Sequence, residues 1–435
     1  MQQYIKRFSL CHLALFSGAI ATTLTMSLLP ARSVRASFQD SPKALVDEVW
    51  QLVNREYVDA TFNKVNWQTS RQNLLSKNYT SKEQAYNAVR EELEKLGDPY
   101  TRFLDPKQFA ALTDQTAGEL SGVGIRMEVN EQTKRLTVVE AIENSPALKA
   151  GIKSGDQILA IDGKPTQDLD VQQASSMIRG KAGTPVSLSI GRSGQNLNIK
   201  LTRARIEVPT VRYSVKQEGK NRVGYISLRE FNAHAAEQMQ RAIYDLNRQQ
   251  VDSYVLDLRG NPGGLLQSSI EIARMWLETG DIVRTVDRRG RSEKLAANHT
   301  ALVKQPVAVI VDGNSASASE ILAGAIKDNN RGVVVGSQTF GKALVQSVHS
   351  LSDGSGLAIT IAHYYTPKGT DISHKGITPD VKIDLTEAQI RQLASNPKLI
   401  GTQNDPQYLR AIAVLGTNSL AQTTPNQTLK PLTIR

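Results

Sequence analysis

The stretch VAVIVDGNSASASE, residues 307–320, decides the fold class. Its first five residues are apolar and mostly β-branched, which predicts a buried strand. The small polar residues that follow predict a tight turn, and the run from 320 to 328 predicts a helix. A strand that turns directly into a helix is the repeating unit of α/β proteins with parallel sheets.

The same alternation extends over residues 206–385. We predict an α/β core there, with strands at 223–228, 253–258, 307–311 and 333–335 and helices at 234–249, 265–277 and 320–328.

The chain before this core has two regions of different character. Residues 113–205 hold short β-rich runs between glycine turns, with helical stretches near 146–150 and 171–179. Residues 37–112 read as helical, and within them the helical spacing over 85–96 ends at a Gly-Asp-Pro sequence, 97–99. We expect this helical region to serve packing or dimerisation and to carry no chemistry.

The two ends of the chain are predicted to lie outside these units. Lys6 and Arg7 precede an apolar run over 9–29, and small residues at 34 and 36 mark a cleavage point, so 1–36 predicts a signal peptide. An uncleaved membrane anchor is the alternative, because the run is long enough to span a bilayer. Residues 386–435 predict a C-terminal helix, at 406–415, and a mobile polar tail.

The composition excludes several classes of protein. With 435 residues, 40% hydrophobic and 22% charged, the chain is a multidomain globular protein and not a disordered one. Cys11, the one cysteine, would leave with the signal peptide, which excludes disulfides, cysteine metal sites and thiol catalysis. The net charge of +10 would then fall to +6, since 1–36 hold four basic residues and no acidic one. The remaining charge is scattered, so we expect no nucleic acid to bind.

The serine-rich turn is the first place where catalysis could occur. A serine between a strand and a helix is exposed, and the free N–H groups of the helix can hold an oxyanion. Ser315, Ser317 and Ser319 are all possible nucleophiles. The alternative is structural, because Ser317-x-x-Glu320 is a capping box in which Ser317 caps the helix. No Gly-x-Ser-x-Gly elbow and no His-Glu-x-x-His zinc motif occur in the sequence.

A hydrolytic serine needs a base, and no histidine stands in a recognisable catalytic setting. Lys342 follows a β-branched strand, is next to Phe340 and Gly341, and precedes an apolar run. Such surroundings can desolvate an amine and lower its pKa, although an isolated lysine is more often on the surface. Gly336-x-x-x-x-Gly341-Lys342 also matches the start of a P-loop. Ala343 replaces the required Ser or Thr and a strand pattern follows, so we expect no nucleotide.

Two glycine-rich loops complete the possible sites. In the loop Asp257–Gly264, the Gly263 amide could approach a substrate carbonyl as an oxyanion donor, or the loop could be a simple turn. In Gly122-Val123-Gly124-Ile125, successive N–H groups could hold a peptide's terminal carboxylate, with the peptide added as a strand. A β-turn is the simpler interpretation of this loop alone.

Together these motifs resemble the carboxyl-terminal processing proteases, serine peptidases with a PDZ domain. The resemblance covers about 40–385 and rests on four motifs in the family's order: 145–163, which is similar to a PDZ core, 257–264, 315–320 and 339–342. It implies a multidomain α/β fold with a helical N-terminal region, a PDZ domain and a peptidase core with a Ser/Lys dyad.

The resemblance also assigns roles to residues. It implies that Ser317 is the nucleophile, Lys342 the general base and Gln346 the group that orients the lysine, and that the amides of Gly263 and Ala318 form the oxyanion hole. No metal or cofactor is implied.

The expected function is cleavage near the free C-terminal tails of exported proteins. The glycine loops at 119–125 and 260–264 are similar to a cyanobacterial and chloroplast branch that matures a photosystem II reaction-centre precursor in the thylakoid lumen. A periplasmic protease would carry the same motifs, and a non-catalytic PDZ scaffold or chaperone for tails is the competing class. Peripheral proximity to a membrane and the oligomeric state are left open.

Overall fold

The computed structural model describes residues 41–130 and 132–422. The predicted signal peptide and the last thirteen residues of the predicted tail, 423–435, lie outside the described residues. No helix in the described ranges is long and apolar enough to cross a bilayer.

A helical region opens the described chain. Its apolar faces form one core with strand β18 of the neighbouring sheet, through Leu45, Val49, Leu93 and Ile359. The region is not wholly helical, since a short strand lies within the range predicted as helix. Its elements are α2 (Pro42–Glu56), η1 (Phe62–Lys64), α3 (Trp67–Ser76), α4 (Lys82–Glu94), β1 (Arg102–Leu104) and α5 (Pro106–Ala117).

A second unit follows, built on an antiparallel sheet of six strands in the order β3-β4-β5-β7-β8, with β6 beside β5. Its core is aliphatic and includes Val123, Ile158 and Leu188. The elements are β2 (Glu119–Gly122), β3 (Ile125–Val129), β4 (Leu136–Ala141), α6 (Pro146–Lys149), β5 (Gln157–Ile161), β6 (Lys164–Pro165), α7 (Val171–Ile178), β7 (Pro185–Arg192), β8 (Gln195–Thr202) and β9 (Ala204–Glu207).

The third unit is a six-stranded sheet with helices on both faces, and it has the order β10-β11-β12-β15-β16-β19. All neighbours are parallel except β10 and β11. Helices α8 to α10 pack on one face and α12 on the other. The elements are β10 (Val211–Glu218), β11 (Asn221–Leu228), α8 (Ala235–Arg248), β12 (Ser253–Asp257), α9 (Leu266–Trp276), β15 (Val307–Val311), α10 (Ala318–Asp328), β16 (Val333–Gly336), β19 (Val381–Lys382), α11 (Glu387–Ser395), η2 (Pro397–Leu399) and α12 (Pro406–Gln422). Helix α12 is longer than the predicted 406–415.

An antiparallel sheet extends this core towards the N-terminal helices. It has the order β1-β18-β13-β14, with β17 also paired to β18. The strands are β13 (Asp281–Asp287), β14 (Ser292–Ala296), β17 (Leu344–Ser350) and β18 (Gly356–Tyr365). The segment after Lys342 is therefore a strand, as expected, and not the helix of a P-loop.

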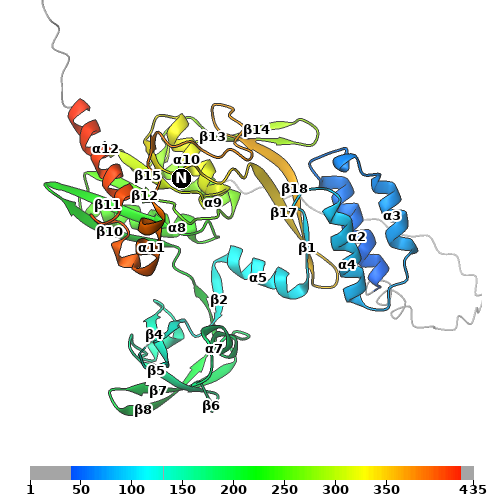
Figure 1. Cartoon of the computed structure of the whole chain (residues 1–435), viewed down its shortest axis with the longest axis horizontal. Helices are drawn as coiled ribbons and strands as arrows, with labels where there is room; N and C mark the ends of the chain where they lie inside the picture. The colour runs from blue at the N-terminus through cyan, green and yellow to red at the C-terminus, as the bar shows by residue number, and fades with distance from the viewer. Residues whose placement is uncertain (1–40, 131, 423–435) are drawn as a thin grey trace, which may run out of the picture.

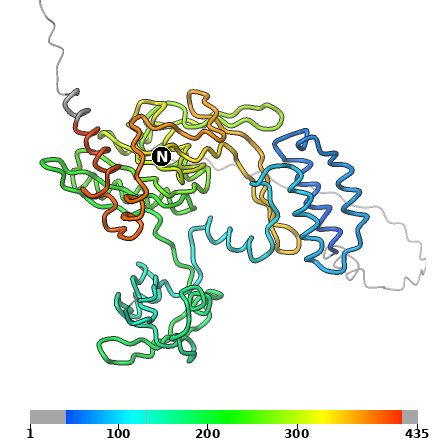
Figure 2. The backbone as a smooth tube through the Cα atoms, viewed as in Figure 1, coloured from blue at the N-terminus to red at the C-terminus, as the bar shows by residue number. Residues whose placement is uncertain are grey.

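The N-terminal helices and the parallel-sheet core lie at opposite ends of the molecule, with β17 and β18 between them (Figure 1). The second unit projects to one side and is joined to the rest by the segments around β2 and β9. The tube in Figure 2 shows that the chain enters and leaves the second unit at the same side, where β2 pairs with β9.

Candidate active site

The serine-rich turn lies at the carboxyl end of β15, at the start of α10. Ser317 is the N-cap residue of α10 and has φ 54° and ψ −113°. A positive φ is strained for a residue with a Cβ, and such conformations concentrate at functional sites. Its side chain is half-buried. Ser317 thus stands at the N-cap position that the sequence predicts, with a half-buried hydroxyl at the head of the helix.

The two neighbouring serines are placed differently. Ser315 and Ser319 are fully buried. The Ser315 hydroxyl donates to the Leu258 carbonyl at 2.9 Å, and the Ser319 hydroxyl donates to the Asn261 carbonyl at 2.9 Å. Both hydroxyls hold the turn against the loop that follows β12, so neither is free to reach a substrate.

Glu320 connects the serine turn to the lysine loop. Its carboxylate is buried and accepts from the Ser317 N–H at 2.8 Å and the Thr339 hydroxyl at 2.6 Å. It also accepts from the N–H groups of Gly341 at 2.7 Å and Lys342 at 2.9 Å. Burial raises the pKa of Glu320, and these four donors act in the opposite sense. The capping-box pattern pointed to Glu320, but it did not reveal the contacts with the lysine loop.

The predicted oxyanion donors lie next to Ser317. A Cβ placed on Gly263, whose φ is +105°, would come within 2.9 Å of the Ser317 Cβ and 3.0 Å of the Ala318 nitrogen. The Ala318 N–H, in the first turn of α10, makes no hydrogen bond within the described ranges. The Gly263 N–H donates to Asn261 Oδ1 at 2.9 Å. The structure thus brings both amides to the serine, with one of them bonded internally.

Lys342 comes from the loop between β16 and β17. Its ammonium nitrogen lies 4.4 Å from the centre of the Tyr100 ring. Burial lowers the pKa of Lys342, and the positive charge of Arg102 acts in the same sense, while Asp98 and Glu320 act against it. A lowered pKa is what a lysine needs to act as a base near neutral pH.

The amine of Lys342 makes no hydrogen bond or ion pair among the residues described. The hydroxyl of Ser317 and the amide of Gln346 are therefore not bonded to it here. Gln346 Nε2 is buried and has no hydrogen-bond partner in the described part of the chain. Tyr364, which is buried in β18, donates to the backbone carbonyls of Ser317 and Lys342 and so links the two backbones.

The loop predicted to bind a carboxylate lies between β2 and β3. Val123 is buried, and Gly124 has φ +80°. Their carbonyls accept from the N–H groups of Ala147 and Ile142, at 2.9 and 2.8 Å. The N–H groups of Val123 and Gly124 make no hydrogen bond in the ranges that the structure describes. Gly122 ends β2 and Ile125 begins β3, so the four predicted residues form one short connection.

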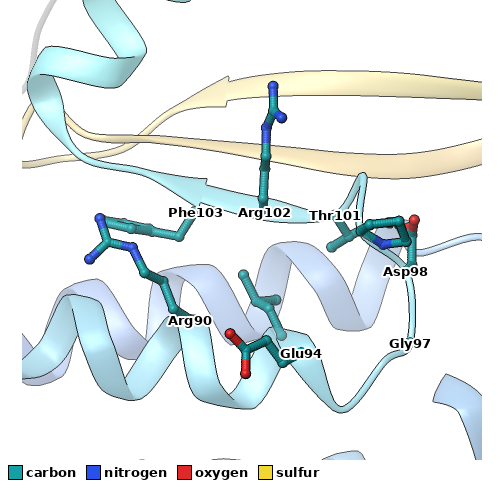
Figure 3. Close-up of a pocket in the computed structure, with 9 residues that line it drawn as sticks. Arg90, Glu94, Gly97, Asp98, Thr101, Arg102 and Phe103 are labelled. Carbon is teal, nitrogen blue, oxygen red and sulfur yellow. Dashed lines mark hydrogen bonds between the residues drawn. The ribbon is translucent and has the colours of Figure 1, made fainter.

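One cavity lies beside Tyr100, outside the predicted site. It has a volume of about 410 Å³ and lies between α4 and β1 (Figure 3), and none of the predicted site residues lines it. Arg102 extends to the other side of β1 from Arg90 and Glu94. Asp98 and Arg102 line this cavity and are two of the three charges that act on Lys342.

Known proteins resemble this chain over most of its length. Residues 222–383 match peptidase family S41, and residues 121–202 match the PDZ domain. The chain is 41% identical over 401 residues to a carboxyl-terminal-processing protease of Picosynechococcus sp., which covers 92% of this chain and 95% of the relative. The chain belongs to the carboxyl-terminal processing proteases.

Other members of this family extend the comparison to chloroplasts. The C-terminal processing peptidase of Tetradesmus obliquus is 37% identical, over 82% of this chain and 79% of that one. The solved structure of a photosystem II D1 C-terminal processing protease is 35% identical, with a TM-score of 0.54, and covers 85% of this chain and 99% of that one. The predicted family, the PDZ and peptidase fold and the serine-peptidase class are confirmed.

The N-terminal helical region of this protease reaches the amine of Lys342, a neighbour that the sequence reasoning missed. Tyr100 contacts that amine, and Asp98 and Arg102 act on it through their charges. The expectation that this region carries no chemistry stays a prediction. No local motif marks Tyr100. The one available signal was the Gly-Asp-Pro sequence at 97–99, which ends the helix and predicts that the next residues, Tyr100 included, form a loop.

Proposed function

We propose that this protease cleaves exported proteins near their C-terminal tails with Ser317 as nucleophile and Lys342 as general base. The observation that carries the proposal is the contrast among the three serines. Ser317 is half-buried at the head of α10 with a strained backbone, while the hydroxyls of Ser315 and Ser319 are buried and bonded.

In the proposed reaction, neutral Lys342 takes the proton of the Ser317 hydroxyl as its oxygen attacks the peptide carbonyl. Gln346 orients the lysine. The amides of Gly263 and Ala318 hold the negative charge that develops on the carbonyl oxygen. The Gly263 amide must first exchange its bond with Asn261 for one with substrate. Lys342 then gives its proton to the leaving amine, and water releases the acyl-enzyme.

Substrate selection is assigned to the PDZ domain. The unpaired N–H groups of Val123 and Gly124 support a carboxylate site over Gly122–Ile125, and the tail would lie beside β3 as an added strand. The name of the solved relative, a photosystem II D1 C-terminal processing protease, supports the D1 precursor as substrate. The proposed location is the thylakoid lumen, reached by export through the signal peptide predicted over residues 1–36. Export to a periplasm, with a wider set of substrates, is the alternative location.

The test compares purified residues 37–435 with Ser317→Ala, Lys342→Ala and Ser315→Ala on an unstructured substrate with a free or an amidated C-terminus. We expect Ser317→Ala and Lys342→Ala to lose cleavage by about 10⁴-fold or more. Ser315→Ala should stay active, and the amidated substrate should be cut more slowly. Cleavage by Ser317→Ala would overturn the nucleophile assignment, and binding of tails without cleavage by the unmodified enzyme would favour the scaffold.

A further inference from the structure

The loop before β1 is held firmly in place beside Lys342. Asp98 accepts from the Tyr100 N–H at 2.9 Å and from the hydroxyls of Thr101 and Thr360 at 2.7 and 2.6 Å. The Thr101 hydroxyl in turn accepts from the Thr360 N–H at 3.0 Å. Thr101 and Thr360 are buried. The loop is therefore tied to β18, the strand that pairs with the one following Lys342, and these bonds fix the backbone from which the Tyr100 ring extends.

The ring of Tyr100 is the partner of the lysine amine in this structure. The distance of 4.4 Å from Lys342 Nζ to the ring centre is within the range of a cation–π contact. This contact favours the ammonium form, because a ring face attracts a cation and has little attraction for a neutral amine. The residue expected to orient the lysine, Gln346, has its Nε2 unpaired.

Several charged or titratable groups face the same amine. Arg102 of β1 disfavours the ammonium form, whereas Asp98 of the loop and Glu320 of α10 favour it. Tyr364 of β18 bonds the Lys342 carbonyl and is un-ionised, since burial raises its pKa. Tyr100 is likewise un-ionised for the same reason. The Tyr100 ring is therefore neutral, while the charged groups around Lys342 act on its amine in opposite senses. The ring itself acts on the amine through its π face.

We propose that Tyr100 is a positioning residue for the general base: its ring face holds the charged amine of Lys342 beside the serine turn, and deprotonation releases the amine towards Ser317. The proton lost on release goes to water, and the neutral amine can then accept the proton of Ser317. The N-terminal helical region thereby takes part in the reaction. This inference rests on the proposed role of Lys342 as base.

The experiment measures the titration of Lys342 directly, in the full enzyme. The amine is labelled with a trace of acetic anhydride across a pH range, and acetylation of Lys342 is quantified by mass spectrometry, in parallel with the pH dependence of kcat/KM. Tyr100→Leu removes the ring, and Tyr100→Phe keeps it. Phe is a matched control, because the Tyr100 hydroxyl makes no hydrogen bond within the described residues.

Loss of the ring should make the ammonium form less favourable. We expect the titration midpoint of Lys342 to fall by about half a unit to one unit in Tyr100→Leu and to stay in place in Tyr100→Phe. The acid limb of kcat/KM should move in the same direction. Fluorinated phenylalanines at position 100 provide a second series that does not depend on how the fold accepts Leu. They keep the shape of the ring and weaken its negative face, so the midpoint should fall with each added fluorine.

The outcomes separate this inference from the proposed function. A Lys342 midpoint that is unchanged in Tyr100→Leu and in the fluorinated series would overturn the role of Tyr100 and leave the base assignment standing. Full activity of Lys342→Ala would overturn both. A midpoint that rises in Tyr100→Leu would also contradict the role of Tyr100, because it would mean that the ring disfavours the charged amine.

Discussion

The turn that carries Ser317 and the loop that carries Lys342 meet at one site but are stabilised in different ways. The serine turn connects β15 of the six-stranded sheet to α10. The buried hydroxyls of Ser315 and Ser319 attach this turn to the loop after β12. The lysine amine has an aromatic ring as its neighbour and no hydrogen bond in the described ranges, and Gln346 Nε2 is unpaired. We call the turn of Ser317 the nucleophile half and the loop of Lys342 the base half, after the roles proposed for them. The nucleophile half is held by hydrogen bonds on both sides of Ser317, whereas the Lys342 amine and Gln346 Nε2 of the base half have none among the residues described.

The largest expected effect comes from filling the space beside the nucleophile. Gly263→Ala would place a Cβ within 2.9 Å of the Ser317 Cβ and 2.8 Å of the Ala316 carbonyl oxygen. We expect kcat to fall by about 10²–10³-fold, the size of losing an oxyanion donor, with a smaller change in KM. Steady-state kinetics on a tail-bearing peptide measures both.

Gly260→Ala is the matched control for this substitution. Gly260 also has a positive φ, +67°, but a Cβ there meets no atom within 4 Å. Gly260→Ala introduces the strain of the left-handed region, about 1–2 kcal/mol, without a contact. Gly263→Ala adds the contact and also more strain, because its φ of +105° lies outside that region. Equal losses of activity in the two variants would show that strain alone is responsible and that the Gly263 amide is no oxyanion donor.

The next largest effect is expected for Glu320, whose carboxylate joins the serine turn to the lysine loop. In Glu320→Gln, one carboxylate oxygen becomes an NH₂ group that faces two donors, so two bonds to the serine turn or the lysine loop are lost. We expect the free energy of unfolding to fall by about 2–4 kcal/mol and kcat to fall with it. Urea denaturation measures the first and peptide cleavage the second.

Glu237→Gln tests whether the effect depends on burial. Glu237 also lies in the first turn of a helix, α8, but it is exposed and its partner is Arg241. Its replacement should change stability by less than about 0.5 kcal/mol. A loss in Glu237→Gln as large as in Glu320→Gln would assign the effect to the helix dipole and not to the buried bonds.

A smaller effect is expected for Gln346, the residue proposed to orient Lys342. Gln346→Met removes a buried amide whose nitrogen has no partner here. We expect stability to be kept or raised by about 1 kcal/mol, while kcat falls about tenfold because the amide is needed in the active arrangement. Thermal unfolding and single-turnover kinetics separate the two. A clear loss of stability would mean that Gln346 is already bonded in solution, and that the base half is as complete as the nucleophile half.

The sequence predicted the nucleophile half better than the base half for a physical reason. Strand, turn and helix follow one another over residues 307–320, so local patterns contain the geometry of the serine turn, including the capping-box partner Glu320. The surroundings of Lys342 are assembled from β1, α10 and β18, which are distant in sequence. Tyr100 lies more than 200 residues before Lys342, and no local signal links them. The positive φ of Ser317 was likewise beyond a pattern of residue types.

The smallest predicted effect concerns the charge that faces Lys342 from β1. In the proposed reaction the neutral amine is the active form, so kcat/KM should rise with pH through the pKa of Lys342. Burial and Arg102 place that rise below the ordinary lysine value of about 10.4. Arg102→Gln removes a positive charge, which makes the ammonium form more favourable, so the midpoint should move up. Arg102 is exposed, and solvent screening limits the change to a few tenths of a unit. About 1 M salt, with a Debye length of about 3 Å, should abolish the difference between the two enzymes.

The control is Lys107→Gln, which removes an exposed positive charge on α5. It should leave the midpoint of the Lys342 titration unchanged. If Arg102→Gln moves it down, Arg102 acts through the loop that holds Tyr100 and not through its charge.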